Sequence, residues 1–417
     1  MSPVTVRILH AEAGPHAGPL ERALIGARAE LAERHRRGFE AAGAGDVRVV
    51  GGPPDGLPFG TRLRGLVGEA LHNGASGLII LGSGAVPLAT NRDRRVFVTA
   101  AGGPAPAALA NNVYSADIVA ISGPALLRDL RDVPDLPADN ALPRWLAEVA
   151  CVPVSGLDRW RLGIDLDSPL DLLLAGRAAD AARLRKAGTP LVAVETRLTR
   201  VRAILGDRRA ELVLAGRTSA RTLRALERGA ACRVRALVEE RGLRAASTLA
   251  FGAAGGGPAE VSGIRDAGGS DGRSAFRAVA ATRPPRSALG LLVDRDGPAA
   301  LGGLLAELGD GAVIDTRVLM AHRWGADEAG WPSPEDRFAA DLLLPERIGD
   351  PWLRALVTGL HDAPIPVLGG GHTLVGPGIR LLAATPARAP STAGVAGMAR
   401  AARPAHAARL TSALRLT

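Results

Sequence analysis

Acid, base and arginine side chains follow segments near the C-terminus that have the composition of buried strands. Asp315 and Arg317 come directly after an apolar run, and His372 follows three glycines at residues 369–371. Glycines let backbone amides approach an anion closely, and a histidine can bind a phosphate or transfer a proton. Asp315, Arg317 and His372 are therefore candidate catalytic residues. The alternative for the glycine-rich stretch is an ordinary turn with a surface histidine.

A second polar group precedes the apolar run at residues 118–122. It contains Asn111, Asn112 and Asp117. Two adjacent asparagines can recognise a sugar or the edge of a base through paired donors and acceptors. Alternatively they form a turn, because asparagine accepts left-handed backbone conformations. Asn111, Asn112 and Asp117 are candidate ligand-binding residues.

A loop of small residues, Gly82, Ser83 and Gly84, follows the apolar run at residues 77–81. Ligands of α/β proteins bind at the carboxyl ends of strands, and this loop has that position. It contains no acid, base or metal ligand. The stretch DLDSPLDL at residues 165–172 has the pattern of a helix start, in which Asp167 and Ser168 cap the helix and Pro169 occupies its first turn.

Apolar periodicity predicts strands that alternate with helices along the chain. Strands are expected at residues 4–9, 46–50, 77–81, 117–122, 191–195, 211–215 and 365–368. Helices are expected at residues 20–42, 63–73, 124–131, 142–150, 219–228 and from 170 onward. Residues 95–98 read as a strand or a helix end, and residues 232–238 as a strand or a helix. This alternation predicts the α/β fold class with a mostly parallel sheet.

The length of 417 residues and the spacing of these elements predict two α/β domains, at residues 1–180 and 188–385. Residues 251–286 are rich in glycine, alanine, serine and arginine, which predicts a long mobile loop. Residues 386–417 lack strong periodicity, so we expect a disordered tail.

The composition restricts the possible partners. The net charge is +9, but the arginines are spread among acidic residues and form no run, which argues against a nucleic-acid partner. A modest positive field favours phosphorylated substrates. No apolar run reaches the ~18 residues of a membrane span, and the N-terminus lacks the pattern of a signal peptide. We therefore expect a cytoplasmic protein without a membrane partner.

Three stretches of the first predicted domain, residues 60–83, 109–120 and 162–172, resemble the nucleotide-diphospho-sugar transferase superfamily in their order. The likeness is to the GT-A-like fold of small nucleotidyltransferases, such as the molybdenum cofactor and 2-phospholactate guanylyltransferases. DLDSPLDL resembles the late family segment that starts the final helix. The resemblance covers residues 1–180, and the second half of the chain resembles no family.

The resemblance implies transfer of a nucleotidyl group or a nucleotide-linked sugar to a small-molecule acceptor. Such transfer uses a divalent cation, here Mg²⁺, on the phosphates, held by one or two carboxylates. Asp165 and Asp167 would hold this cation and act as catalytic residues. Gly82, Ser83 and Gly84 would line the nucleotide, and the Asn111–Asn112 pair would contact the substrate.

Two parts of the family pattern are absent. The loop at residues 10–19 contains no lysine, and Gly82–Ser83–Gly84 stands where the family has a metal-binding aspartate. The alternative is a degenerate transferase fold that only binds a ligand or partner, with any catalysis in the C-terminal half. Carboxylates that converge on Ser83 in an open pocket would favour the enzyme. Buried or helix-capping carboxylates and a filled pocket would favour the binding domain.

Overall fold

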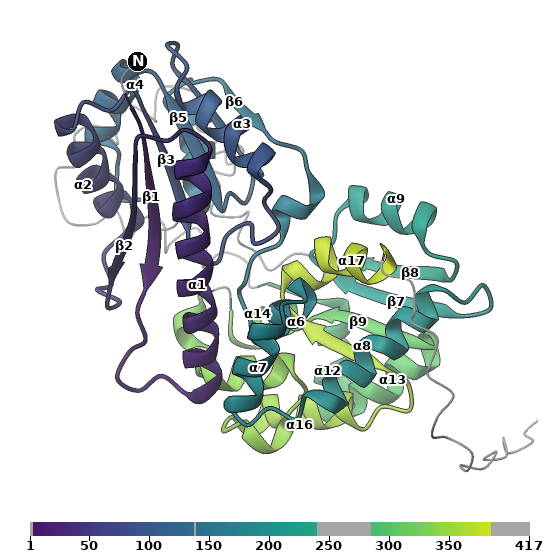
Figure 1. Ribbon diagram of the computed structural model, residues 1–417. Helices are drawn as coiled ribbons and strands as arrows, with labels where there is room; N and C mark the ends of the chain where they lie inside the picture. The colour runs from purple at the N-terminus through teal and green to yellow at the C-terminus, as the bar shows by residue number, and fades with distance from the viewer. Residues whose placement is uncertain (1–2, 137–138, 240–284, 326, 385–417) are drawn as a thin grey trace, which may run out of the picture. The chain divides into compact units, whose positions relative to one another are not determined.

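Strands and helices alternate along the chain in a computed structural model, which describes residues 3–136, 139–239, 285–325 and 327–384 (Figure 1). Met1–Pro386 form one compact unit, and its described residues form two sheets. The predicted tail lies outside the described residues, and so does the predicted loop apart from residues 285 and 286.

The first sheet has six strands in the order β2-β1-β3-β5-β4-β6. Their bounds are β1 Val4–Ala11, β2 Asp46–Gly52, β3 Gly77–Gly82, β4 Ala107–Ala110, β5 Ile118–Ser122 and β6 Val154–Gly156. β1 pairs in parallel with β2 and β3, and β4 in parallel with β6. β5 is antiparallel to both β3 and β4. The carboxyl ends of β1 and β3 therefore lie side by side at one edge of the sheet.

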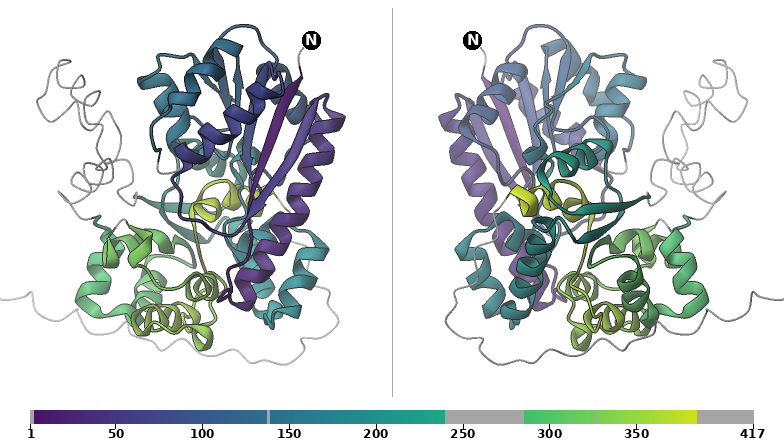
Figure 2. Two further views of the ribbon diagram at one scale, coloured as in Figure 1. Left: turned by 90° about the vertical axis from the view of Figure 1, so that its left-hand side faces the viewer. Right: turned by 90° about the vertical axis from the view of Figure 1, so that its right-hand side faces the viewer.

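Helices cover both faces of this sheet because its strands are apolar on both sides. Within β3, Ile79 and Leu81 join one core with side chains of α1 (Pro19–Ala41) and α3 (Asn91–Ala101). Leu78 and Ile80 join the opposite core with α2 (Phe59–His72), α4 (Pro124–Asp129) and α5 (Leu142–Glu148), and Figure 2 shows the sheet between its helices. This two-sided burial follows from the period-two alternation of side chains along a strand.

The second sheet is fully parallel, with four strands in the order β10-β9-β7-β8. Their bounds are β7 Glu211–Gly216, β8 Arg233–Val238, β9 Gly311–Asp315 and β10 Val367–Gly370. The other α-helices among the described residues are α6 Pro169–Ala175, α7 Ala178–Lys186, α8 Leu191–Leu205, α9 Ala220–Gly229, α12 Ala288–Asp296, α13 Leu301–Leu308, α14 Thr316–Trp324, α15 Pro334–Asp341, α16 Pro351–His361 and α17 Ile379–Ala384. A single helical turn, η9 (Leu374–Gly378), precedes α17.

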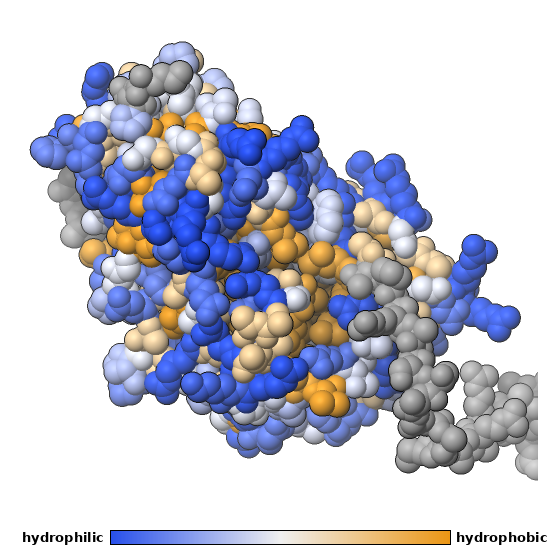
Figure 3. All heavy atoms as spheres, in the orientation of Figure 1, coloured by the Kyte–Doolittle hydropathy of each residue, from blue (hydrophilic) through white to orange (hydrophobic). Residues whose placement is uncertain are grey.

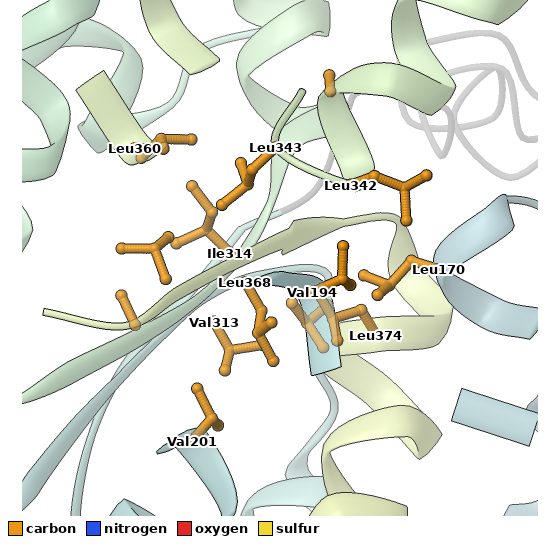
Figure 4. Close-up of a cluster of buried hydrophobic side chains, with 14 of the residues drawn as sticks. Leu170, Val194, Val201, Val313, Ile314, Leu342, Leu343, Leu360, Leu368 and Leu374 are labelled. Atoms are coloured by element: carbon orange, nitrogen blue, oxygen red, sulfur yellow. The ribbon is translucent and has the colours of Figure 1, made fainter. Parts of the chain in front are cut away.

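Helix α1 contributes to the cores of both sheets. Leu24 and Leu31, from its earlier turns, belong to the apolar cluster of the four-stranded sheet, whereas Phe39 belongs to that of the six-stranded sheet. Leu170 of α6 lies in the same cluster as Ile314 of β9, as Figure 4 shows. Each fully buried leucine stabilises the fold by about 2 kcal/mol through removal of its surface from water.

The predicted fold class, an α/β protein with a mostly parallel sheet, is confirmed. The predicted strand at residues 191–195 is wrong, because this segment begins helix α8. Its buried residues, Leu191, Val194, Leu198 and Val201, recur every three or four positions, which is the helical period. Residues 95–98 lie in α3, and residues 233–238 form a strand.

The surface carries many arginine–carboxylate pairs, such as Arg36 with Glu33 and Arg48 with Glu69. On the face in Figure 3, hydrophilic residues alternate with apolar ones and form no single continuous patch. Within the part of the chain that the structure describes, every helix is too short or too polar to cross a bilayer.

Candidate functional site

An open pocket of about 310 Å³ lies at the carboxyl ends of β1 and β3. It is lined by Leu9, His10, Ala11, Arg28, Val50, Gly52, Pro53, Pro54, Arg62, Gly82, Ser83, Gly84, Ala85, Asp117, Asp139 and Asp165. Five candidate residues from the sequence, Gly82, Ser83, Gly84, Asp117 and Asp165, therefore meet in one place. The pocket has basic groups and carboxylates in the same lining, which suits a charged ligand with a cation.

The Ser83 loop (residues 82–86) is held by the first helix and strand. The Ser83 amide donates to the carbonyl of Leu9 at 2.8 Å. Buried His35 of α1 contacts the carbonyl of Ala85 through Nε2 at 2.8 Å. Burial, followed by the charge of Arg94, lowers the pKa of His35 to about 3, so this imidazole is neutral and Nε2 donates. Val86 has a φ of 42°, a strained conformation that such fixed contacts maintain.

Asp165 is carried against this loop by a backbone bridge. Ala85 pairs with Asp165, and the Leu166 amide donates to the carbonyl of Gly84 at 3.1 Å. A Cβ at Gly84 would stand 2.9 Å from Asp165 Oδ1, so the glycine permits this close approach. Burial, with the negative charges of Asp167 and Asp117, raises the pKa of Asp165 well above its usual range.

Asp167 is accessible and does not cap helix α6. Its side chain is 48% exposed, and it pairs with Arg28 Nη2 at 3.2 Å and with His372 Nδ1 at 3.8 Å. The cap is formed by Ser168 and Asp171, which bond reciprocally, so the capping interpretation holds for Ser168 and is wrong for Asp167. Although desolvation acts in the opposite direction, the charges of His372 and Arg28 lower the pKa of Asp167.

Asn111 holds Asp117 in place through two hydrogen bonds. It is buried, its Nδ2 donates to Asp117 Oδ2 at 2.7 Å, and its Oδ1 accepts from the Asp117 amide at 2.9 Å. Burial raises the pKa of Asp117 to about 8, with added repulsion from Asp167 and Asp139 and against the Asn111 hydrogen bond. Asn112 instead accepts from the Tyr114 amide at 3.0 Å, the local turn that was the alternative interpretation.

Asp315 and Arg317 lie outside the pocket lining, each in an ion pair of the four-stranded sheet. Asp315 accepts from Arg217 through both carboxylate oxygens, at 2.5 and 3.0 Å. Arg317 donates to both oxygens of Asp341, at 2.9 and 2.5 Å. All four side chains are at most 18% exposed. These contacts place Asp315 and Arg317 in buried ion pairs, which their position after a strand did not reveal.

Among the described residues, no group of three or more histidine, cysteine or acidic side chains is arranged to hold a metal. Four titratable or charged residues of the pocket lining were not among the sequence candidates: His10, Arg28, Arg62 and Asp139. His10 could have been found from strand order, since it lies near the carboxyl end of β1, the strand that pairs with β3. Arg28 lies in the middle of a long helix, where spacing gives no signal.

Comparison with known proteins yields little beyond this geometry. No family model matches the chain, and no curated protein matches it. A solved structure from Desulfovibrio desulfuricans G20, provisionally assigned as a nucleotide-diphospho-sugar transferase, is similar over 45% of this chain and 95% of its own. The identity is 13% and the TM-score 0.33, so the similarity carries no argument about function.

Proposed function

We propose that this protein is a nucleotidyl- or sugar-nucleotide-transferase-like enzyme of small-molecule metabolism, with its site in the Ser83 pocket. The observation that supports this most is the placement of Asp165 on the Ser83 loop in an open pocket, with Asp167 exposed nearby. Neither carboxylate caps a helix and the pocket is open, which favours an enzyme, whereas the burial of Asp165 favours a binding domain.

The two aspartates fit Mg²⁺ in their chemistry. Mg²⁺ prefers oxygen ligands and is usually bound by one or two carboxylates together with substrate phosphates and waters. A third protein ligand is therefore not required. Asp117, Asp139, Asp165 and Asp167 also repel one another, which contributes to the raised pKa of Asp117 and Asp165. A divalent cation between Asp165 and Asp167 would relieve this repulsion and would polarise a bound phosphate.

Arginines replace the missing lysine in this proposal. Arg28 and Arg62 line the pocket, and Arg28 is fixed by its Nε donating to the carbonyl of Leu166 at 2.7 Å. Guanidinium groups match phosphate oxygens in charge and geometry. Arg28 and Arg62 would bind the phosphates of the nucleotide or sugar nucleotide, and Asp117 would contact its sugar or base.

Thermal unfolding tests the proposal. The protein is heated with each nucleoside triphosphate and with common sugar nucleotides, with and without Mg²⁺. A ligand at ~100 times its dissociation constant stabilises the folded state by about 2.7 kcal/mol. We expect a Mg²⁺-dependent stabilisation by one nucleotide in the wild type and in the surface control Asp296→Asn, and its loss in Asp165→Asn. Absence of stabilisation by every nucleotide would contradict the proposal.

A binding domain without catalysis is the second candidate. It is favoured by the Ser83 loop, which presents no carboxylate where the transferase pattern has a metal ligand. This candidate predicts stabilisation by a nucleotide that is equal with and without Mg²⁺ and unchanged in Asp165→Asn. The same unfolding measurements therefore separate the two functions.

A further inference from the structure

His10 and Ser83 form a hydrogen-bonded pair at the carboxyl ends of β1 and β3. Nδ1 of His10 lies 3.1 Å from Oγ of Ser83. The two residues follow Leu9 and Gly82, which are direct neighbours in the parallel pairing of β1 with β3. The Ser83 amide is bonded to the Leu9 carbonyl at 2.8 Å, so the backbone on both sides is fixed. The pair is thus held by the sheet and does not depend on a flexible surface contact.

The pair has the composition of a nucleophile with its base. A serine hydroxyl is a weak nucleophile unless an adjacent base accepts its proton, and the two must lie within hydrogen-bond reach. Burial and then the charge of Arg28 lower the pKa of His10, against the effect of Glu12, so the imidazole is neutral at neutral pH and has a free ring nitrogen to accept a proton. Both side chains line the 310 Å³ pocket, so a bound molecule can reach them.

The surroundings leave space for an electrophile and carry the charge to bind one. A side chain at Gly82 would meet no atom within 4 Å, so the pocket has free space at this residue, while Ser83 is 5% exposed. Arg28 and Arg62 line the same pocket. Guanidinium groups make strong charge-assisted, often bidentate hydrogen bonds to the negative oxygens of a phosphoryl group, whereas a neutral acyl group offers one uncharged carbonyl oxygen. The pocket therefore favours a phosphoryl electrophile.

We propose that Ser83 is a nucleophile that His10 activates for attack on a phosphoryl group. In this step a bond forms between Ser83 Oγ and phosphorus, and the bond from phosphorus to the leaving group breaks. The leaving group departs with the electron pair of that bond. The hydroxyl proton passes to Nδ1 of His10. The product is a phosphoryl ester of Ser83, and the reaction requires no oxidant or reductant.

A fluorophosphonate probe tests this without any knowledge of the natural ligand. The full-length protein is incubated with the probe, fluoride is the leaving group, and the labelled residue is found by peptide mass spectrometry. We expect the adduct on Ser83, and none on Ser115, a polar residue outside the pocket lining. General-base catalysis contributes ~10²–10⁴-fold, so His10→Gln should label at least ~100-fold more slowly. Its melting temperature reports whether it is folded.

The outcomes separate this inference from the proposed function. Labelling of Ser83 in the wild type that is slowed in folded His10→Gln supports the inference, even if no nucleotide stabilises the protein. An unlabelled Ser83 in the wild type overturns it, even if nucleotides do bind. Equal labelling rates in the wild type and in folded His10→Gln overturn the role of His10. The wild-type result is decisive whether or not the variant folds.

Discussion

The Arg317–Asp341 ion pair allows a stability measurement that tests whether Arg317 stabilises the fold or takes part in catalysis. The guanidinium of Arg317 donates to both carboxylate oxygens of Asp341, at 2.9 and 2.5 Å. The side chain of Asp341 is fully buried, and that of Arg317 is 11% exposed. We consider the change Asp341→Asn, which keeps the shape of the side chain and removes its charge.

The expected loss in free energy of unfolding follows from the burial of the charge that remains on Arg317. Removal of one partner from a buried pair leaves the other charge without compensation, which costs about 3–5 kcal/mol. An exposed pair would contribute only about 0–1 kcal/mol. Replacement of both partners by apolar residues of similar volume is often neutral. Asp341→Asn should therefore be strongly destabilising, and the double replacement Arg317→Met with Asp341→Leu should be much less so.

Urea unfolding at neutral pH measures both variants against the wild type. We expect the single variant to lose about 3–5 kcal/mol and the double variant to lose less than half of that. Nucleotide binding, if the wild type shows any, should persist in the double variant, since neither residue lines the pocket. A loss below about 1 kcal/mol in Asp341→Asn would refute the reasoning.

Three other changes have expected outcomes. Gly216→Ala should lower the free energy of unfolding in urea by about 2–3 kcal/mol. Gly216 has a φ of 125°, and a Cβ there would stand 2.2 Å from the Cβ of Asp315. The control Gly229→Ala should show no such loss, because a Cβ at Gly229 would meet no atom within 4 Å. Asp117 has a pKa of about 8 when folded, above the unfolded value of ~3.9, so its contribution to wild-type stability falls as pH rises between these values. Asp117→Asn lacks this dependence. The free energy of unfolding of the variant minus that of the wild type should therefore rise by up to about 3 kcal/mol from about pH 5 to about pH 7.5. A difference that stays constant with pH would contradict the assigned protonation. Glu335 accepts the amides of Leu20 and Glu21 at 3.0 and 3.1 Å, so Glu335→Gln should lower the free energy of unfolding by about 1 kcal/mol, and an unchanged midpoint would exclude this capping role.

Periodicity was sufficient for most of the six-stranded sheet. The strands at residues 4–9, 46–50 and 77–81 were predicted because each is a short apolar or alternating run, and the last two are closed by glycine. β4 and β6 were not predicted, since a four-residue and a three-residue strand are too short for a period to appear. The start of α8 was misassigned for the related reason that its first apolar residues resemble a strand.

The candidate site was predictable from three separate signals. Ser83 was found because it follows a strand, Asp117 because it belongs to a polar group before one, and Asp165 because DLDSPLDL resembles the late family segment. Asp315 also ends a strand, but its partner Arg217 lies far away in the sequence, and spacing does not show that two charges will neutralise each other. Arg28 reaches the pocket from the middle of a helix, which only the packing of α1 against both sheets determines.

The central claim is that Asp165 and the Ser83 loop form the Mg²⁺-dependent nucleotide site. Titration calorimetry tests it most directly, with the nucleotide that stabilises the wild type most, in the presence and absence of Mg²⁺. We predict that Asp165→Asn or removal of Mg²⁺ weakens binding at least ~10-fold, a change of about 1.4 kcal/mol in binding free energy, and that the two effects are not additive. Equal affinity for the wild type and Asp165→Asn in Mg²⁺, or no binding of any nucleotide, would contradict the claim.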